Sequence, residues 1–275
     1  LAPWIICGLA AVLAALSGVA LLVRTEIERR AVEGLLLDQA ELEAAQATTA
    51  MVDGLNAVIF SVERLTHFVA RDVEGDIPTS AIAERTARNV MVDNPNIYGF
   101  GIALDPASPP PANARFGVYV HRSNVPGGLV TRDLTAEDQT FWTRDWYREA
   151  LAKGLPVWSE PFFDRGGTDR NAVRVTIPIF RPVGDEREPF GAATAVIDLD
   201  WLRRLANVNE FADTSFTIVF SRSGRLIVHP KSSYVTAETV ETLAEKTNTP
   251  ELVAIRQSIL ARRQGSLSYN ESFPT

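Results

Sequence analysis

The sequence is poor in the residue types from which most catalytic and metal sites are built. It holds one cysteine and three histidines among 275 residues. The cysteine, Cys7, lies inside an apolar run, so an internal disulfide scaffold is excluded. The histidines His67, His121 and His229 are far apart, and no spaced set of metal ligands accompanies them. We therefore expect no catalytic residue, no metal and no cofactor, and we do not expect this chain itself to be an enzyme.

An excess of positive charge is also missing. The 27 lysines and arginines are outnumbered by 34 acidic residues, and the formal net charge is -7. Because neutralising phosphates requires a basic surface, nucleic acid is not an expected partner. The glycine pairs at Gly127 and Gly166 are not followed by the helix start of a phosphate-binding loop, so they indicate turns.

One stretch lacks charge altogether. Residues 4–23 are apolar and long enough to cross the roughly 30 Å hydrocarbon core of a membrane. A cleavable signal peptide is the alternative, but residues 21–24 offer no small-residue cleavage site. We therefore expect a transmembrane helix at residues 1–24. By the positive-inside tendency, Arg24, Arg29 and Arg30 would place the following residues in the cytoplasm.

Past this span, the hydrophobic pattern separates helices from strands. Residues 25–74 contain no proline and are rich in Ala, Leu and Glu, which predicts a long stalk helix that leans on a sheet or on its copy in a homodimer. Thr79 caps a shorter helix to about residue 93, and a third begins near Thr143 or Arg144 and stops at Gly154. Strands are expected at residues 97–104, 115–121, 129–133, 155–163, 171–180 and 190–197, with a polar loop at 184–189. Helices segregated to one side of an antiparallel sheet give an α+β fold.

A second module is expected after this sheet. A short helix at residues 199–208 leads to two strands within 215–228, a helix at 238–263 and a strand at 265–269. These elements do not close a sheet of ordinary size, so we expect the sequence to stop inside the module. The expected organisation is a transmembrane helix (1–24), a stalk helix (25–74), a membrane-distal ligand-binding module (75–208) and an incomplete membrane-proximal module (209–275).

Residues 141–164 combine an arginine, several aromatic rings and a carboxylate. Arg144 at a helix start offers a planar fork for a carboxylate, and Trp146 offers an indole donor. Asp164 and Asp198, if neighbouring strands bring them together, would need a cation between them because two buried carboxylates repel each other. A zwitterionic ligand satisfies both requirements. The alternative is an internal ion pair between Arg144 and one of the two aspartates.

At these residues the sequence resembles the double Cache sensor domains of bacterial transmembrane receptors. Residues 144–150 are similar to the family's Arg-x-Trp-Tyr-x-x-Ala segment, 158–164 to its Glu-Pro-Tyr-x-Asp strand, and 191–201 to its strand ending in Asp-x-x-Leu. The resemblance implies PAS-like modules on the periplasmic or extracellular side of the bacterial cell membrane, and we give it more weight than the opposite indication of Arg24, Arg29 and Arg30. It also implies an output module beyond residue 275, such as a chemoreceptor, kinase, cyclase or phosphatase module.

The same resemblance implies roles for single residues. Arg144 and Trp146 would hold the carboxylate of an amino acid, and Tyr147, Asp164 and Asp198 would surround its ammonium group.

Two positions depart from the family pattern. Phe162 replaces the strand tyrosine, so that it keeps a ring face for a cation but loses the hydroxyl. Gln139 stands where a tyrosine often precedes the arginine. The expected ligand is therefore an amino acid, an amine or a small carboxylate. A ligand-free module that dimerises or docks a periplasmic partner is the alternative.

Overall fold

The structure, a computed structural model, describes residues 3–105, 115–123, 125–136, 140–165, 167–207 and 217–261, with side chains from residue 21 onward. Gln139 and the expected strand at 265–269 lie outside the described residues. The chain divides into two compact units, Leu1–Thr49 and Ala50–Thr275. Each unit is described by itself.

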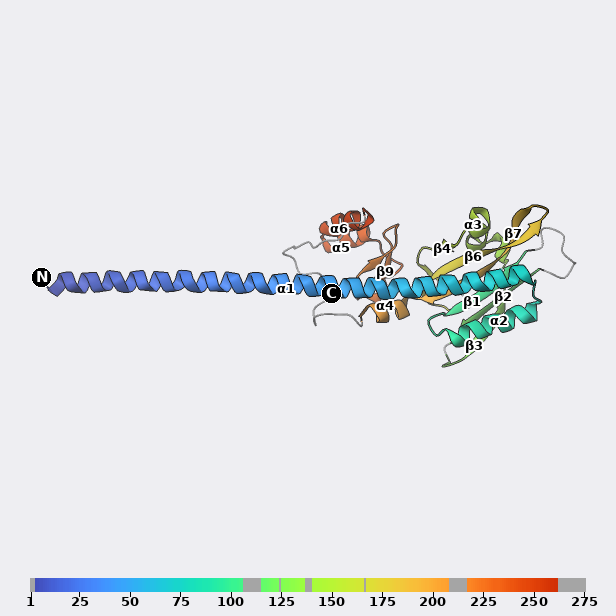
Figure 1. The fold of residues 1–275 in the computed structure, drawn as a ribbon, viewed down its shortest axis with the longest axis horizontal. Coiled ribbons are helices and arrows are strands. Elements are labelled where there is room, and N and C mark those ends of the chain that lie inside the picture. Colours follow the sequence, from blue (N-terminus) through green and yellow to red (C-terminus); the bar gives the residue numbers. More distant parts are fainter. Residues whose placement is uncertain are drawn as a thin grey trace. The chain divides into compact units, whose positions relative to one another are not determined.

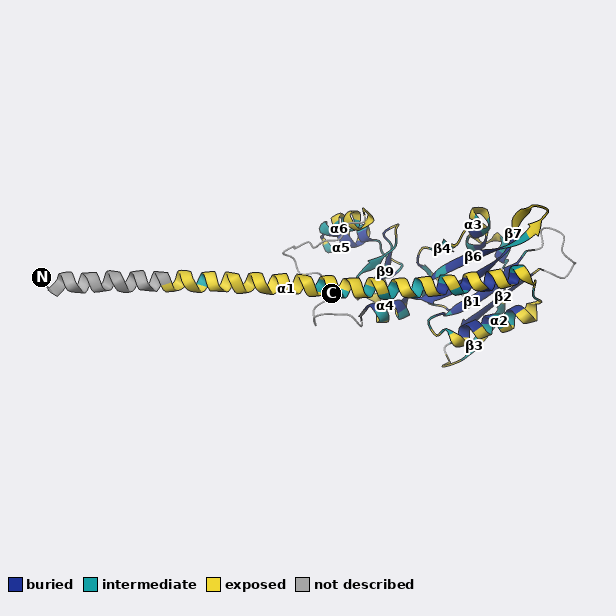
Figure 2. Ribbon diagram, viewed as in Figure 1, coloured by how far each residue is buried: buried dark blue, intermediate teal, exposed yellow. Residues whose placement is uncertain are grey.

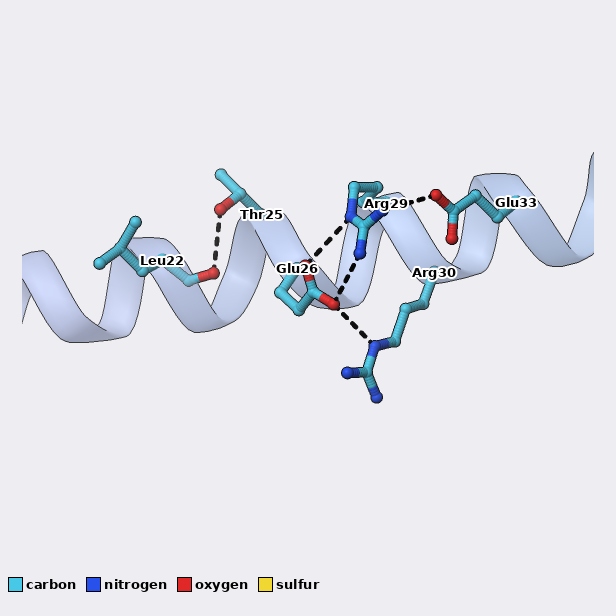
Figure 3. Close-up of polar contacts among 6 residues, drawn as sticks. All are labelled: Leu22, Thr25, Glu26, Arg29, Arg30 and Glu33. Atoms are coloured by element: carbon cyan, nitrogen blue, oxygen red, sulfur yellow. Dashed lines mark hydrogen bonds and ion pairs between the residues drawn. The ribbon is translucent and has the colours of Figure 1, made fainter.

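The first unit is part of one uninterrupted helix, α1 (Pro3–Gly75). Among its described side chains, leucines such as Leu35 are largely exposed, as Figure 2 shows. Glu26 accepts hydrogen bonds from Arg29 and Arg30, and Arg29 also pairs with Glu33 at 2.7 Å (Figure 3). The bonds from Arg29 and Arg30 lower the pKa of Glu26. These pairs, three and four residues apart, support the helix on its polar side.

Among the residues searched, no helix is long and apolar enough to cross a membrane. Most of the span expected at residues 4–23 lies outside the described side chains, which begin at residue 21. The transmembrane helix therefore stays a prediction.

In the second unit, α1 becomes amphipathic. Val62, Val69 and Val73 recur at helical spacing and are almost completely buried. Together with α2 (Ser80–Asp93) they cover one face of the sheet (Figure 1). Thr79 caps α2 as expected, because its side chain accepts a hydrogen bond from the backbone N–H of Ile82.

The sheet is wholly antiparallel and has the strand order β3-β2-β1-β7-β6-β4, with β5 also paired to β6. Its strands are β1 (Gly99–Leu104), β2 (Phe116–Arg122), β3 (Leu129–Asp133), β4 (Val157–Trp158), β5 (Phe162–Phe163), β6 (Asn171–Val183) and β7 (Glu186–Asp198). The mixed helix and antiparallel-sheet fold is confirmed. Two details were wrong: residues 155–163 form two short strands, and the expected polar loop at 184–189 is a tight turn in which Gly184 adopts φ 63°.

The expectation that the helices gather on one side of the sheet was also wrong. Alternate residues of one strand point to opposite faces, and Ile102 packs toward α1 and α2 whereas Ala103 packs with Tyr147 of α3 (Asp145–Lys153). A short 3-10 helix, η1 (Phe141–Thr143), precedes α3, and Gly154 ends α3 with φ 63°. Helices therefore cover both faces, and the candidate site lies on the α3 face.

The remaining elements are α4 (Leu199–Asn207), β8 (Val219–Phe220), β9 (Leu226–Val228), η2 (Ser232–Tyr234), α5 (Val240–Thr247) and α6 (Glu251–Leu260). Leu226 and Leu243 belong to a small separate core. The single helix expected at 238–263 is two helices, because Asn248 ends α5 with φ 52° and Pro250 caps α6.

Candidate functional site

A cavity of about 60 Å³ lies where the start of α3 meets the sheet. Its volume is several times the roughly 10–15 Å³ that a single water requires, so it has room for a group larger than one water molecule. Four of its ten lining residues are arginines and one is an aspartate. The lining comprises Tyr119, Arg132, Leu134, Arg144, Trp146, Asp164, Arg165, Gly167, Arg174 and Thr194.

Two glycines of β1 make the space in which the ring of Tyr119 lies. A Cβ placed on Gly99 would come within 2.0 Å of the Tyr119 hydroxyl oxygen, and one on Gly101 within 3.2 Å of its ring. Tyr119 is thereby held flat across the central strands, and its hydroxyl donates to Oδ2 of Asp164 at 3.0 Å. Burial, followed by the charge of Asp164, raises the pKa of Tyr119 well above its usual value, so the tyrosine stays protonated and remains a donor.

Asp164 is the carboxylate at the centre of this arrangement. It is 7% exposed and follows β5 at the start of a tight turn. Besides the tyrosine, the backbone N–H of Thr168 donates to Oδ2 at 2.9 Å, and Nη2 of Arg174 pairs with Oδ1 at 3.1 Å. Both oxygens of this buried carboxylate therefore have protein donors, which is what burial of a charge requires.

Arg174 is the guanidinium that reaches Asp164 from the neighbouring strand β6. Its guanidinium carbon lies 5.2 Å from the ring centroid of Trp146 and 4.6 Å from that of Phe162. Such cation–π contacts are worth about 0.5–2 kcal/mol each. Two rings and one carboxylate therefore fix the arginine in place, with its side chain 14% exposed.

The other arginines of the lining come from three different parts of the chain. Arg132 lies on β3 directly opposite Tyr119 in the register, and its Nε is buried without a hydrogen-bond partner among the described residues. Arg144 is the residue that caps the N-terminal end of α3, and Arg165 is exposed at the turn after Asp164. Arginines therefore outnumber acidic side chains in the described lining.

Of the six residues expected to bind ligand, Arg144, Trp146 and Asp164 line the cavity, and three do not. Tyr147 is buried under α3, where its hydroxyl lies 3.4 Å from the carbonyl oxygen of Phe190. Burial raises the pKa of Tyr147. The ring of Phe162 faces a cation as expected, but that cation is Arg174 of the protein itself.

Asp198 is directed elsewhere, at the end of β7. Its Oδ2 pairs with Arg170 at 3.3 Å, and its Oδ1 accepts from the backbone N–H of Asp200 at 2.8 Å. Burial raises the pKa of Asp198. The two aspartates thus have separate arginine partners, Arg170 and Arg174, rather than a shared cation.

Sequence reasoning missed Tyr119, Arg132 and Arg174. The alternation of side chains along the strands could have identified them. Arg174 falls between the core residues Val173 and Val175, so its side chain must point to the opposite face of the sheet. Tyr119 alternates in the same way between Val118 and Val120.

Comparison with known proteins agrees with this architecture. Residues 83–204 match the family model described as the first PDC sensor domain of methyl-accepting chemotaxis protein-like proteins. An extracellular domain described as that of a histidine kinase, soHK1S-Z6, is 23% identical with a TM-score of 0.58, and the match covers 75% of this chain and 78% of that one. The ligand-binding domain of the Pseudomonas aeruginosa PAO1 amino acid chemoreceptor PctC, solved with GABA, is 21% identical with a TM-score of 0.55 over 77% of this chain and 84% of that one.

A methyl-accepting chemotaxis protein X is 18% identical with a TM-score of 0.60, and the match covers 79% of this chain and 84% of that one. At such identities, the structural likeness concerns the fold. The family match adds the class of domain for the segment that contains the sheet, α3 and the cavity. Residues 83–204 are therefore a sensor domain of the PDC, or Cache, type.

Proposed function

We propose that this chain is the extracytoplasmic sensor part of a transmembrane signalling receptor, and that its cavity binds a small ligand through a carboxylate. The observation that carries the proposal is the gathering of Arg132, Arg144 and Arg174 around one enclosed space with a single aspartate. The Nε atoms of Arg132 and Arg174 are buried without a hydrogen-bond partner among the described residues, and a buried donor left unsatisfied is costly. A ligand anion removes that cost when it binds.

Arg144 and Trp146 form the proposed carboxylate clamp. Arg144 stands at the N-terminal end of α3, where the helix dipole also favours an anion. A guanidinium can make two parallel hydrogen bonds to a carboxylate, and the Trp146 indole adds an N–H donor beside an apolar wall. Both side chains line the cavity, so a bound carboxylate would join α3 to the sheet.

A chain of contacts leads from the cavity to α1. Arg174 exchanges backbone hydrogen bonds with Ser159, because its carbonyl accepts from the Ser159 N–H at 2.8 Å and its N–H donates to the Ser159 hydroxyl oxygen at 3.0 Å. The adjacent Trp158 donates its indole N–H to Glu63 of α1 at 2.7 Å. A ligand that contacts Arg174 can thus favour one position of α1, provided that it binds the two positions of the helix unequally.

The surrounding parts of the receptor follow from the same proposal. A membrane anchor at residues 1–24 would hold the sensor at the bacterial cell membrane with the modules outside. Two copies would pair along the face of α1 that carries the exposed Phe60 and Phe68, which are 67% and 69% exposed. Signal output would pass through α1 to sequence that the sensor does not include.

A thermal-shift screen of the 275-residue chain tests the proposal. At a hundredfold excess over its Kd, a ligand stabilises the folded state by about 2.7 kcal/mol, a rise in Tm of roughly 5–10 °C at about 2–4 °C per kcal/mol. Amino acids, amines and small carboxylates form the panel. Arg144→Ala should abolish the shift, and Arg148→Ala, on the exposed side of the same helix, should keep it. Silence across the panel would refute ligand sensing by this cavity.

One observation favours a second function, a ligand-free module that dimerises or docks a periplasmic partner. Asp164 is already paired with Arg174 inside the protein, so that side chains occupy part of the site. Under this alternative, Arg144→Ala changes the Tm of the free protein but alters no ligand response. The same screen therefore distinguishes the two functions.

A further inference from the structure

We infer that Arg174 determines ligand specificity at the cavity. Its guanidinium occupies a cation-binding position made by Asp164, Trp146 and Phe162, and it thereby excludes ligands that carry an ammonium group. This role rests on the proposed function and names a specificity-determining residue of that same site. The cation-binding position does not depend on how a ligand carboxylate is held, so it can be tested separately.

Three side chains form the cation-binding position. Asp164 supplies a carboxylate that is 7% exposed, and Trp146 and Phe162 supply aromatic rings. A ring face attracts a cation within about 6 Å of its centroid. The guanidinium carbon of Arg174 lies 5.2 Å from the centroid of Trp146 and 4.6 Å from that of Phe162. Its Nη2 lies 3.1 Å from Oδ1 of Asp164. All three groups therefore act on one cation, which the chain supplies itself.

The two oxygens of Asp164 have different roles in this position. Oδ2 accepts from the Tyr119 hydroxyl at 3.0 Å and from the Thr168 N–H at 2.9 Å. Neither bond involves Arg174, so both would keep the carboxylate oriented after that arginine is replaced. Oδ1 accepts from Nη2 of Arg174. A ligand ammonium would need this second oxygen, and in the wild-type protein the guanidinium is bound to it.

An ammonium group would also meet a like charge. Among the described residues that line the cavity, Asp164 is the only one with an acidic side chain. An ammonium that approaches Asp164 therefore approaches the guanidinium of Arg174 as well. The Arg174 side chain is 14% exposed, and salt screens partly buried charges less than surface charges. A carboxylate ligand without an ammonium group avoids this repulsion.

The backbone at residue 174 is held independently of its side chain. The Arg174 N–H donates to the Ser159 hydroxyl oxygen at 3.0 Å, and its carbonyl accepts from the Ser159 N–H at 2.8 Å. The neighbouring Val173 and Val175 are buried on the opposite face of the sheet. Shortening the Arg174 side chain should therefore leave β6 in place and open a space beside Asp164.

Calorimetric titration of the 275-residue chain compares ligands that differ by one ammonium group. The probes are butyrate with α-aminobutyrate, and succinate with aspartate, all at one ionic strength because salt screens these charges. For the wild-type protein, we expect each acid to bind at least about tenfold more tightly than its amino counterpart, the equivalent of about 1.4 kcal/mol. In Arg174→Ala, the amino acid of each pair should bind at least as tightly as the acid. Arg174→Lys, which keeps a cation, should retain the wild-type preference.

A simple cation tests the position without any carboxylate ligand. Arg174→Ala leaves the buried Asp164 without its cation, which should lower the Tm of the protein. Methylammonium chloride should restore part of that Tm, relative to sodium chloride at the same concentration, and should not change the Tm of the wild type. Arg148→Ala removes an exposed arginine of α3 that is not part of the described lining, so it is the matched control and should not respond. Asp164→Asn combined with Arg174→Ala should abolish the response.

The outcomes that overturn the inference differ from those that overturn the proposed function. If the wild type binds an amino acid as tightly as the matching acid or more tightly, Arg174 does not exclude ammonium groups, while the proposed sensor function stands. That result needs no variant, so it holds even if Arg174→Ala does not fold. If methylammonium affects Arg174→Ala and Arg148→Ala equally, the cation-binding position is refuted. If no carboxylate or amino acid of the panel binds the wild type but methylammonium stabilises Arg174→Ala alone, the position stands and the proposed function fails.

Discussion

The substitution Gly99→Ala, which adds one methyl group under the ring of Tyr119, should disrupt the candidate site. Gly99 lies in the central strand β1 under the ring of Tyr119, and a Cβ there would lie 2.0 Å from the hydroxyl oxygen and 2.5 Å from Cζ. Neither separation is tolerable for non-bonded atoms. The backbone of Gly99 is outside the left-handed region, so space alone decides the effect of Gly99→Ala, and the tyrosine ring must move.

The expected cost has two parts. Forcing a group into a well-packed interior costs about 1–3 kcal/mol. Moving the ring also breaks the hydrogen bond from Tyr119 to Asp164, and bonds to charged groups contribute about 1.5–3 kcal/mol. We expect a loss of about 3 kcal/mol or more, which corresponds to a fall in Tm of roughly 6–12 °C or more at about 2–4 °C per kcal/mol.

Differential scanning calorimetry of matched variants measures this loss. Gly54→Ala is the control, because Gly54 lies in the interior of α1 with nothing within 4 Å of an added Cβ, and alanine there should stabilise by about 0.5–1 kcal/mol. Tyr119→Leu combined with Gly99→Ala should be less destabilising than the sum of the two single changes, because the leucine removes the clash. A Tm for Gly99→Ala equal to that of wild type would refute the packing described here.

Three further predictions concern other parts of the chain. Trp158→Phe keeps a ring but loses the donor to Glu63, so the ligand-induced thermal shift should remain while ligand-induced protection of nearby α1 amides in hydrogen exchange disappears; retained protection would exclude this route. Burial lowers the pKa of His229 below its usual value. The stability that the neutral imidazole contributes is therefore present above about pH 6.5 and lost as pH falls through the lowered pKa. The Tm of the protein should fall between pH 7 and 5, and His229→Gln should make that fall smaller. Phe60→Ser with Phe68→Ser should shift the sedimentation of a dimer to that of a monomer without lowering the monomer's Tm, and a wild-type chain that sediments as a monomer would contradict the proposed pairing.

Most boundaries of the helices and strands could be predicted from the residues next to them in the sequence. Thr79 was recognised as a cap and Gly154 as a stop, and the structure has α2 from Ser80 and α3 ending at Lys153. Alternation found β1, β2, β3, β6 and β7 within a few residues, because the face toward α1 and α2 is built from large apolar side chains. These signals depend on neighbours in sequence, which is why they could be read without the fold.

The second covered face was not predictable in the same way. On that face the strands contribute small residues, among them Ala103, Ala172 and Ala192, and the large rings come from η1 and α3. Because small alanines alternate with the large apolar residues of the other face, this face showed too little hydrophobic signal to be recognised as core. The convergence of Asp164 and Asp198 failed for a related reason, since both are aspartates at strand ends but each has its own arginine from β6 or the turn before it.

The face of the sheet to which Arg174 points could have been predicted from the sequence, and it would have changed the ligand that we expected. Val173, Val175 and Ile177 point to the α1 face, so Arg174 must share the opposite face with Ala172 and Thr176. In the register it lies beside Val196, which pairs with Gly99 under Tyr119. An arginine at such a position brings its own cation to the centre of the sheet, next to the residues expected to hold an ammonium group. The motif residues Arg144, Trp146 and Asp164 remain in place around the cavity. One strand residue outside the motif, Arg174, nevertheless neutralises the charge that Asp164 would present to a ligand.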